Sequence, residues 1–276
     1  MPSTYAHYRL GQEVVRSLPD EIKEIIENNR ELYNIGLHGP DILFYYKPFF
    51  SNKVNQTGFG MHDEPAEGFF ESAGKLILNK YGRGACLAYI YGFICHFVLD
   101  SECHGYIDEK IERSGVSHTE IEVEFDRDLL VRDGFNPITK SLTDHIIPSE
   151  KNAEIIAEFF TGITKEEVKE ALESMKKFNH ILVAPSRGKR LLIYGLLAIT
   201  GNYKELHGLV VNYKANPDCM DSTEKLRRLY VTAVRESIRL ITAYEYTLWQ
   251  EVKLDARYRL TFGSKDTERV KEEVFV

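Results

Sequence analysis

The sequence lacks an apolar run of the roughly 20 residues that a bilayer-spanning helix needs. The best candidate, residues 191–200, has about half that length. The first ten residues also lack the basic stretch and following apolar core of a secretory signal peptide. These absences predict a cytoplasmic protein without a transmembrane segment.

The sequence also has few cysteines and no excess of basic over acidic residues. The four cysteines, Cys86, Cys95, Cys103 and Cys219, form no CxxC motif, so we expect buried, reduced thiols rather than a thiolate metal site. The formal net charge is -7, which argues against a nucleic-acid backbone as the main partner. The surplus carboxylates are groups that bound cations would neutralise.

The strand-like alternation of apolar and polar residues is not sustained anywhere, and we find no repeat or low-complexity segment. Helical spacing or capping signals mark residues 5–16, a helix opened by Pro19, and residues 65–80, 82–111, 117–131, 150–160, 165–178, 187–200 and 222–255. Residues 34–43 and 51–64, which contain glycine, are expected to be loops. The sequence therefore predicts an all-α fold, a single multi-helix domain over residues 1–256 around the central helix, followed by a charged, loosely ordered tail over residues 257–276.

Three residues of metal-ligating types interrupt the most apolar helix at steps of four: His96, Asp100 and His104. A step of four drifts only about 40° around a helix, so all three share one face. His96 and His104 lie roughly 12 Å apart along the axis, too far to share one tetrahedral ion. They therefore indicate at least two ions with Asp100 between them, the alternative being a polar stripe that faces water.

The first half of the chain supplies partners for both ends of this stripe. His118 and Glu122, four apart on the next helix, can bind one ion together with His104 and leave one position open, as catalytic zinc sites do. Asp41 and His62, on glycine-containing segments, are expected to reach His96 and Asp100. Histidine and carboxylate without thiolate suits Zn²⁺, and closely spaced ions suit hydrolysis of a phosphate ester.

The order of these residues resembles the zinc-dependent phospholipase C family, whose all-α fold is shared with zinc-dependent single-strand nucleases. The resemblance covers about residues 1–130 and rests on His7, Gly39-Pro40-Asp41, His62, His96-x₃-Asp100-x₃-His104 and His118-x₃-Glu122. It implies two or three zinc ions: one held by Asp41, His62, His96 and Asp100, a second by His104, His118 and Glu122, and a third by His7 with Asp100 bridging. It also implies that Asp41 is the catalytic general base.

The resemblance implies a metal-dependent phosphoric diester hydrolase whose partner is a phospholipid head group or another small phosphate ester. Three alternatives stay open: a nuclease, an HD-type phosphohydrolase suggested by the dipeptide His62-Asp63, and a non-catalytic metal-binding relative. The last is motivated by a departure from the family's secreted members, which bind the third ion through an N-terminal tryptophan, whereas the only tryptophan here is Trp249. His38 is a further histidine beside the Asp41 motif, and Phe44–Phe50 is an aromatic segment for core or pocket.

Overall fold

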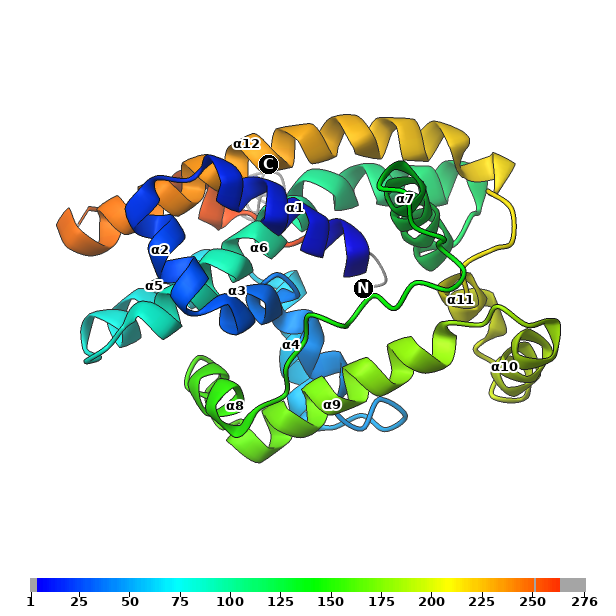
Figure 1. The fold of residues 1–276 in the computed structure, drawn as a ribbon, viewed down its shortest axis with the longest axis horizontal. Helices are drawn as coiled ribbons and strands as arrows, with labels where there is room; N and C mark the ends of the chain where they lie inside the picture. Colours follow the sequence, from blue (N-terminus) through cyan, green and yellow to red (C-terminus); the bar gives the residue numbers. More distant parts are fainter. Residues whose placement is uncertain (1–3, 251, 264–276) are drawn as a thin grey trace, which may run out of the picture.

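The computed structural model describes residues 4–250 and 252–263 of the chain. Over these residues the fold is 73% helical without strands, which confirms the predicted all-α single domain (Figure 1). The α-helices are α1 (Thr4–Ser17), α2 (Asp20–Asn28), α3 (Arg30–Gly36), α4 (Lys53–Asp63), α5 (Glu67–Leu78), α6 (Gly84–Ser114), α7 (His118–Arg132), α8 (Glu150–Ala157), α9 (Lys165–Leu182), α10 (Arg187–Ile199), α11 (Tyr203–Leu206) and α12 (Met220–Gln250). Short 3₁₀ helices are η1 (Gly39–Tyr45), η2 (His207–Leu209), η3 (Pro217–Cys219) and η4 (Ala256–Arg259).

Helix α6 is the centre of the fold. Every residue from 86 to 101 is buried, because α12 packs along one side of the helix and α2 and α3 along the other (Figure 1). Among the described residues, α6 is also the one helix that is long and apolar enough to cross a membrane. The sequence had instead given residues 191–200 as the best candidate. Of its 18-residue apolar window, 89% is buried inside the protein, so its apolar sequence is explained by the core.

Glycine allows α3 and α6 to cross with their backbones in contact. A Cβ on Gly92 of α6 would lie 2.2 Å from the carbonyl oxygen of Tyr33, and one on Gly36 of α3 would lie 2.2 Å from the carbonyl oxygen of Tyr89. Any other residue at either position would force the helices apart. The crossing fixes the end of α3, from which the chain continues directly into η1.

Two segments expected to be loops are helical. Residues 53–63 form α4, which begins with a capping box in which the Asn52 side chain accepts hydrogen bonds from the backbone N–H groups of Val54 and Asn55. The segment with Asp41 is split between the end of α3 and the 3₁₀ helix η1. Gly58 and Gly60 hid the helical pattern of α4, since glycine is a poor helix former.

The packed domain extends past residue 256, where the sequence placed the boundary. Tyr258 and Phe262 are buried among the core aromatics, and Phe262 contacts Phe93 and Phe97 of α6. The start of the expected tail is therefore part of the core. Its remainder, residues 264–276, lies outside the described residues.

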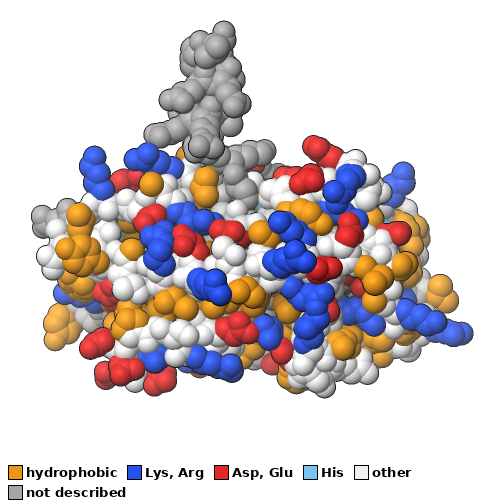
Figure 2. Space-filling model, turned by 90° about the horizontal axis from the view of Figure 1, so that it is seen from above, with side chains coloured by type: hydrophobic (Ala, Val, Ile, Leu, Met, Phe, Trp, Pro, Cys, Tyr) orange, Lys and Arg blue, Asp and Glu red, His pale blue; other side chains and the backbone are white. Residues whose placement is uncertain are grey.

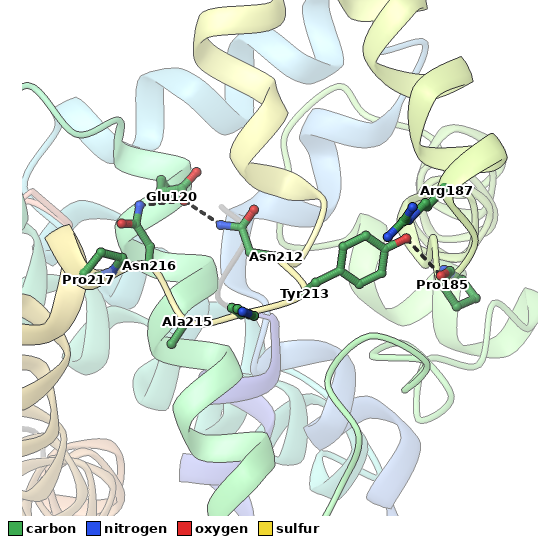
Figure 3. A pocket seen from close by; sticks show the side chains of 9 residues that line it. Glu120, Pro185, Arg187, Asn212, Tyr213, Ala215, Asn216 and Pro217 are labelled. Atoms are coloured by element: carbon green, nitrogen blue, oxygen red, sulfur yellow. Dashed lines mark hydrogen bonds between the residues drawn. The ribbon is translucent and has the colours of Figure 1, made fainter.

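A surface cleft of about 810 Å³ lies where the start of α7, the start of α10 and residues 212–217 meet (Figure 3). Its lining includes Glu120, Arg187, Tyr213 and Lys214. Asn212 donates a 2.7 Å hydrogen bond to Glu120, which joins the two sides of the cleft. Elsewhere, the face seen from above carries acidic and basic side chains interspersed (Figure 2).

Candidate metal centre

The structure brings all eight predicted ligands into three adjoining groups. They come from five elements: His7 from α1, Asp41 from η1, His62 from α4, the α6 residues His96, Asp100 and His104, and the α7 residues His118 and Glu122. The groups are His7, His96 and Asp100; Asp41, His62 and His96; and His104, His118 and Glu122. Within each group, the ligand atoms lie within 4.8 Å of one another, close enough to surround one ion.

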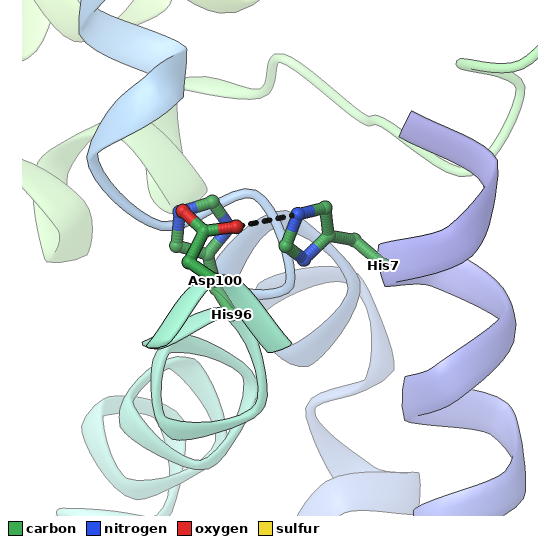
Figure 4. Close-up of side chains that lie close together, drawn as sticks. All are labelled: His7, His96 and Asp100. Atoms are coloured by element: carbon green, nitrogen blue, oxygen red, sulfur yellow. Dashed lines mark ion pairs between the residues drawn. The ribbon is translucent and has the colours of Figure 1, made fainter. Parts of the chain in front are cut away.

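Asp100 lies at the centre of the arrangement. Its Oδ1 is 3.2 Å from His7 Nε2 and 3.8 Å from His104 Nε2, while its Oδ2 is 3.2 Å from His96 Nε2 and 3.8 Å from His62 Nε2. His7 approaches from α1 across the face of α6 (Figure 4). One carboxylate therefore faces all three groups, which is the position that the sequence assigned to a bridging ligand.

The contact between His62 and Asp41 identifies a place for a cation. His62 Nδ1 lies 2.9 Å from the Gly58 carbonyl oxygen, and because a carbonyl only accepts, Nδ1 carries the proton. In the neutral ring, Nε2 is then an unprotonated acceptor, yet it lies 3.1 Å from Asp41 Oδ1, another acceptor. Two acceptors face each other at this distance only if the ring is protonated or an ion lies between them.

The third group joins the end of α6 to the start of α7. Glu122 Oε1 lies 3.1 Å from His118 Nε2 and 3.4 Å from His104 Nε2. Ser117 caps α7, since its hydroxyl accepts a hydrogen bond from Glu120 N, and this fixes the turn that carries His118. The His118 side chain is 36% exposed, so the centre opens to solvent on this side.

Electrostatics favour positive charge throughout the centre. Burial alone would raise the pKa of Asp100, but His96 and His104 hold the pKa of its carboxyl well below its usual range. His104 is largely buried, which alone would lower its pKa, yet Asp100 and Glu122 raise this pKa to about 9. Bound divalent ions would meet this demand for positive charge.

The residues present fit metal ions. His96 Nε2 and His104 Nε2 are buried and form no aligned hydrogen bond within the part of the chain that the structure describes, although carboxylate oxygens of Asp100 and Glu122 lie 3.2 and 3.4 Å away. Such atoms are costly to bury unless something binds them. The donor set of imidazole and carboxylate, with all four free cysteines buried outside the three groups, suits zinc.

Comparison with protein families gives a match to zinc dependent phospholipase C over residues 6–174. The chain belongs to the zinc-dependent phospholipase C family. The match covers all eight candidate ligands and extends through α8 into α9, beyond the first 130 residues on which the resemblance rested. Searches of the curated proteins and of the solved structures found no match.

Two residues position candidate ligands: Asp126, which was missed from the sequence, and Gly39, which the sequence named only as part of the motif Gly39-Pro40-Asp41. Asp126 of α7 is buried, and its carboxylate accepts hydrogen bonds from the backbone N–H groups of Tyr5 and Ala6, at 2.9 and 2.8 Å. It thereby anchors the first turn of α1, which carries His7. Gly39, at a φ of +49°, packs against the His96 ring, where a Cβ would lie 2.2 Å from Cδ2.

Phe262 was also missed. Its buried ring lies 5.1 Å from the His62 ring and 5.8 Å from the His96 ring, so it forms an apolar wall behind these histidines. The available signal was the pair Tyr258 and Phe262, two aromatic residues four apart in an otherwise charged segment.

His38 lies beside the centre without joining any of the three groups of described residues. Its Nε2 is 2.7 Å from His145 Nε2, so one neutral ring donates to the other, and Tyr8 stacks on the His145 ring. Burial lowers the pKa of His145 to about 3 and also depresses that of His38. The pair is therefore neutral and supports the wall of the site between α1 and η1.

Proposed function

We propose that the protein is a zinc-dependent phosphoric diester hydrolase of the phospholipase C type, which holds two or three ions in the three ligand groups. Family membership and the clustered ligands support metal-dependent phosphodiester hydrolysis at the level of the family. The observation that carries the proposal is the central Asp100, whose two oxygens face four histidines of all three groups. Closely spaced ions around one carboxylate suit a phosphoryl group, which presents several charged oxygens.

Zinc ions in these groups would supply an activated water and neutralise charge on the phosphoryl oxygens. The chain contributes Asp41 as the base. Its carboxyl is buried, which alone would raise its pKa, but His96 and His62 lower the pKa so that the group is an ionised proton acceptor. Asp41 also lies in the same group as His62 and His96, so it is positioned to take a proton where a reacting water is held.

Packing defines the walls and the entrance of the site. Phe262 and Phe44 pack against His62 and keep water from its inner side. The partly exposed His118 marks the opposite, open side. A small head group therefore reaches the ions from the α7 side.

The four buried free cysteines support the further proposal that the protein works in the cytoplasm.

The positions of His62 and Asp63 bear on the alternative of an HD-type phosphohydrolase. His62 and Asp63 end α4, so the prediction that this pair lies in a loop is wrong. However, Asp63 is exposed and belongs to none of the three groups of described residues, while His62 pairs with Asp41 instead. This favours the phospholipase type of centre over the HD type.

The test combines metal analysis with hydrolysis assays on a phospholipid and on single-stranded DNA. Wild-type protein should contain two or three zinc ions per chain and hydrolyse the phospholipid. Asp41→Asn should retain at least the α7-side ion yet lose activity by more than about a hundredfold, because it removes both a ligand and the base. His118→Ala should lower the zinc content as well as the rate.

Asp63→Asn is the matched control. The phospholipase type of centre predicts an unchanged rate, whereas an HD-type site predicts its loss. DNA cleavage with intact lipid would favour the nuclease alternative. Full zinc content without hydrolysis of either substrate would favour the non-catalytic alternative.

A further inference from the structure

Helix α10 exposes an apolar face to solvent. Leu191, Leu192, Leu196 and Ile199 are 70%, 65%, 56% and 85% exposed. No charged residue occurs from position 191 to 199. A surface helix of a globular protein normally turns such residues inward and charged ones outward, and contiguous exposed apolar patches mark binding surfaces.

The opposite face of α10 is well packed, so the exposure is a feature of the folded helix. Ile193 is buried with Ala184 and Val210 in a small cluster separate from the main core. Arg190 is also buried: it donates hydrogen bonds to the carbonyl oxygens of Ala184 and Val211 and lies 4.0 Å from the centre of the Tyr213 ring. The helix therefore cannot rotate its leucines inward without breaking these contacts.

The surroundings of α10 are strongly basic, although the protein is acidic. Residues 174–217 contain seven lysines and arginines and one acidic residue, whereas the whole chain has a net charge of -7. Lys189 and Arg190 are engaged in the fold through backbone carbonyls, but Lys177, Arg187, Lys204 and Lys214 are exposed. An apolar face flanked by exposed cations complements an anionic lipid surface.

This segment is attached to the open side of the metal centre. η2 packs on the start of α7, where a Cβ on Gly208 would lie 2.7 Å from Glu120 N, and His207 Nε2 lies 3.5 Å from Glu120 Oε2. Glu120 is two residues from both His118 and Glu122. α11 contacts both α7 and α10, so it connects α10 to the element that carries the exposed side of the centre (Figure 1).

A second exposed apolar group lies beside the last turns of α9, the helix that precedes α10. Phe49 and Phe50 are 77% and 74% exposed, so this part of the aromatic segment belongs neither to the core nor to a pocket wall. Phe49 contacts the ring of Phe178, one turn before the end of α9, and α10 begins five residues after α9 ends.

We propose that α10 is a membrane-docking helix, which lies in the interface of an anionic phospholipid bilayer with its four exposed aliphatic side chains inserted. With 13 residues it is too short to span a bilayer, so docking is peripheral. Arg187, Lys204 and Lys214 contact lipid phosphates beside it. The proposal rests on the proposed function for its purpose, the supply of lipid substrate, but docking itself needs no hydrolysis.

The test is co-sedimentation of the zinc-loaded protein with vesicles of phosphatidylglycerol and phosphatidylcholine, and with vesicles of phosphatidylcholine alone. Wild-type protein should bind the anionic vesicles more tightly, and 0.5 M salt should weaken this binding. The double variant Leu192→Gln/Ile199→Gln should bind at least about tenfold more weakly, because it removes inserted apolar groups. Arg187→Gln/Lys204→Gln/Lys214→Gln should weaken binding by about a hundredfold.

The matched control changes exposed apolar residues elsewhere: Val231→Gln/Tyr246→Gln on α12, which are 50% and 63% exposed in the wild type. This variant should bind as the wild type does. Absence of wild-type binding to anionic vesicles, or equal weakening by the control, overturns the proposal. A wild-type dimer that Leu192→Gln/Ile199→Gln dissociates also overturns it, since a second copy would then cover α10.

Two further measurements separate this proposal from the proposed function. Leu192→Gln/Ile199→Gln should hydrolyse a dispersed short-chain phospholipid at the wild-type rate but lose rate on vesicles, and a loss on both would contradict docking as its role. Asp100→Asn should lose hydrolysis of both substrates yet still bind vesicles. If docking persists while no variant or substrate shows hydrolysis, the proposed function fails and the docking surface stands.

Discussion

Helices α6 and α10 have the two most apolar stretches of the chain and opposite environments. Residues 86–101 of α6 are all buried and the helix carries three candidate ligands, whereas α10 buries one face and exposes four large aliphatic residues. α6 lies within the segment shared with the zinc-dependent phospholipase C family, and α10 lies outside it. Apolar composition alone therefore did not determine burial; the number of helices that pack around each one did.

The difference indicates that two regions of the domain have separate roles, one in holding the candidate ligands and one in presenting a surface. In the region of α1, η1, α4, α6 and α7, close backbone contacts and buried carboxylates fix the positions of candidate ligands from five elements. The region of α9 to α11 presents a surface, with its own small cluster beneath. Substitutions and metal removal should affect the two regions very differently.

Removal of zinc should have the largest effect. The ions would join five elements around Asp100, and without them several buried charges and imidazoles lose their partners. We expect a chelator to lower the melting temperature by about 10 °C or more and to abolish hydrolysis. Calorimetry of chelated and zinc-restored protein checks this. An unchanged melting temperature would contradict the view that the ions hold this region together.

The same glycine substitution should have opposite effects in the two helices. Gly92→Ala places a methyl group against the Tyr33 carbonyl at the crossing of α3 and α6 and should cost about 3 kcal/mol of unfolding free energy. Gly195→Ala in α10 meets no described atom within 4 Å and should stabilise by up to about 1 kcal/mol. Urea unfolding of both variants measures the difference. Equal effects would remove the contrast between the regions.

Loss of the anchor under His7 should have a moderate effect. Asp126→Ala leaves the N–H groups of Tyr5 and Ala6 without their acceptor and should cost about 2 kcal/mol, with weaker zinc binding at His7. The control, Asp128→Ala on the same helix, removes partly exposed ion pairs with Arg132 and Arg227 and should cost about 1 kcal/mol or less. Comparable losses in both variants would mean that the buried anchor has no special role.

The smallest effect concerns pH. Asp133 lies at the surface, where Arg9 and Tyr5 bind its carboxylate, and these contacts outweigh partial burial and lower its pKa. A lowered folded-state pKa stabilises above the unfolded-state value near 3.9, and the stabilisation disappears as the pH falls through the folded-state value. Asp133→Asn should therefore cost up to about 1 kcal/mol at pH 7. The difference from wild type should disappear well below pH 4, as urea unfolding at several pH values would show.

The part of the site that lies on one helix was predictable from spacing, because a step of four fixes the shared face of His96, Asp100 and His104. The joining of distant segments required the order of residues in a known family. Spacing could not show that His62 lies in the last turn of a helix. The two glycines of α4 disfavour a helix, and the capping box at Asn52 stabilises it nonetheless. Nor could it place Asp126 or Phe262, whose contacts reach across more than one hundred residues of sequence.

The crossing of α3 and α6 has a consequence for how substrate is selected. Because the two main chains touch at Gly36 and Gly92, no change of side-chain rotamer lets one helix slide along the other. Asp41 lies five residues after the end of α3 and His96 lies one turn beyond Gly92, so the crossing of the two backbones constrains the distance between them. This half of the site cannot close around a ligand. Under the proposed function, discrimination among phosphate esters would then come from a rigid template that rejects head groups of the wrong shape, and not from an induced fit.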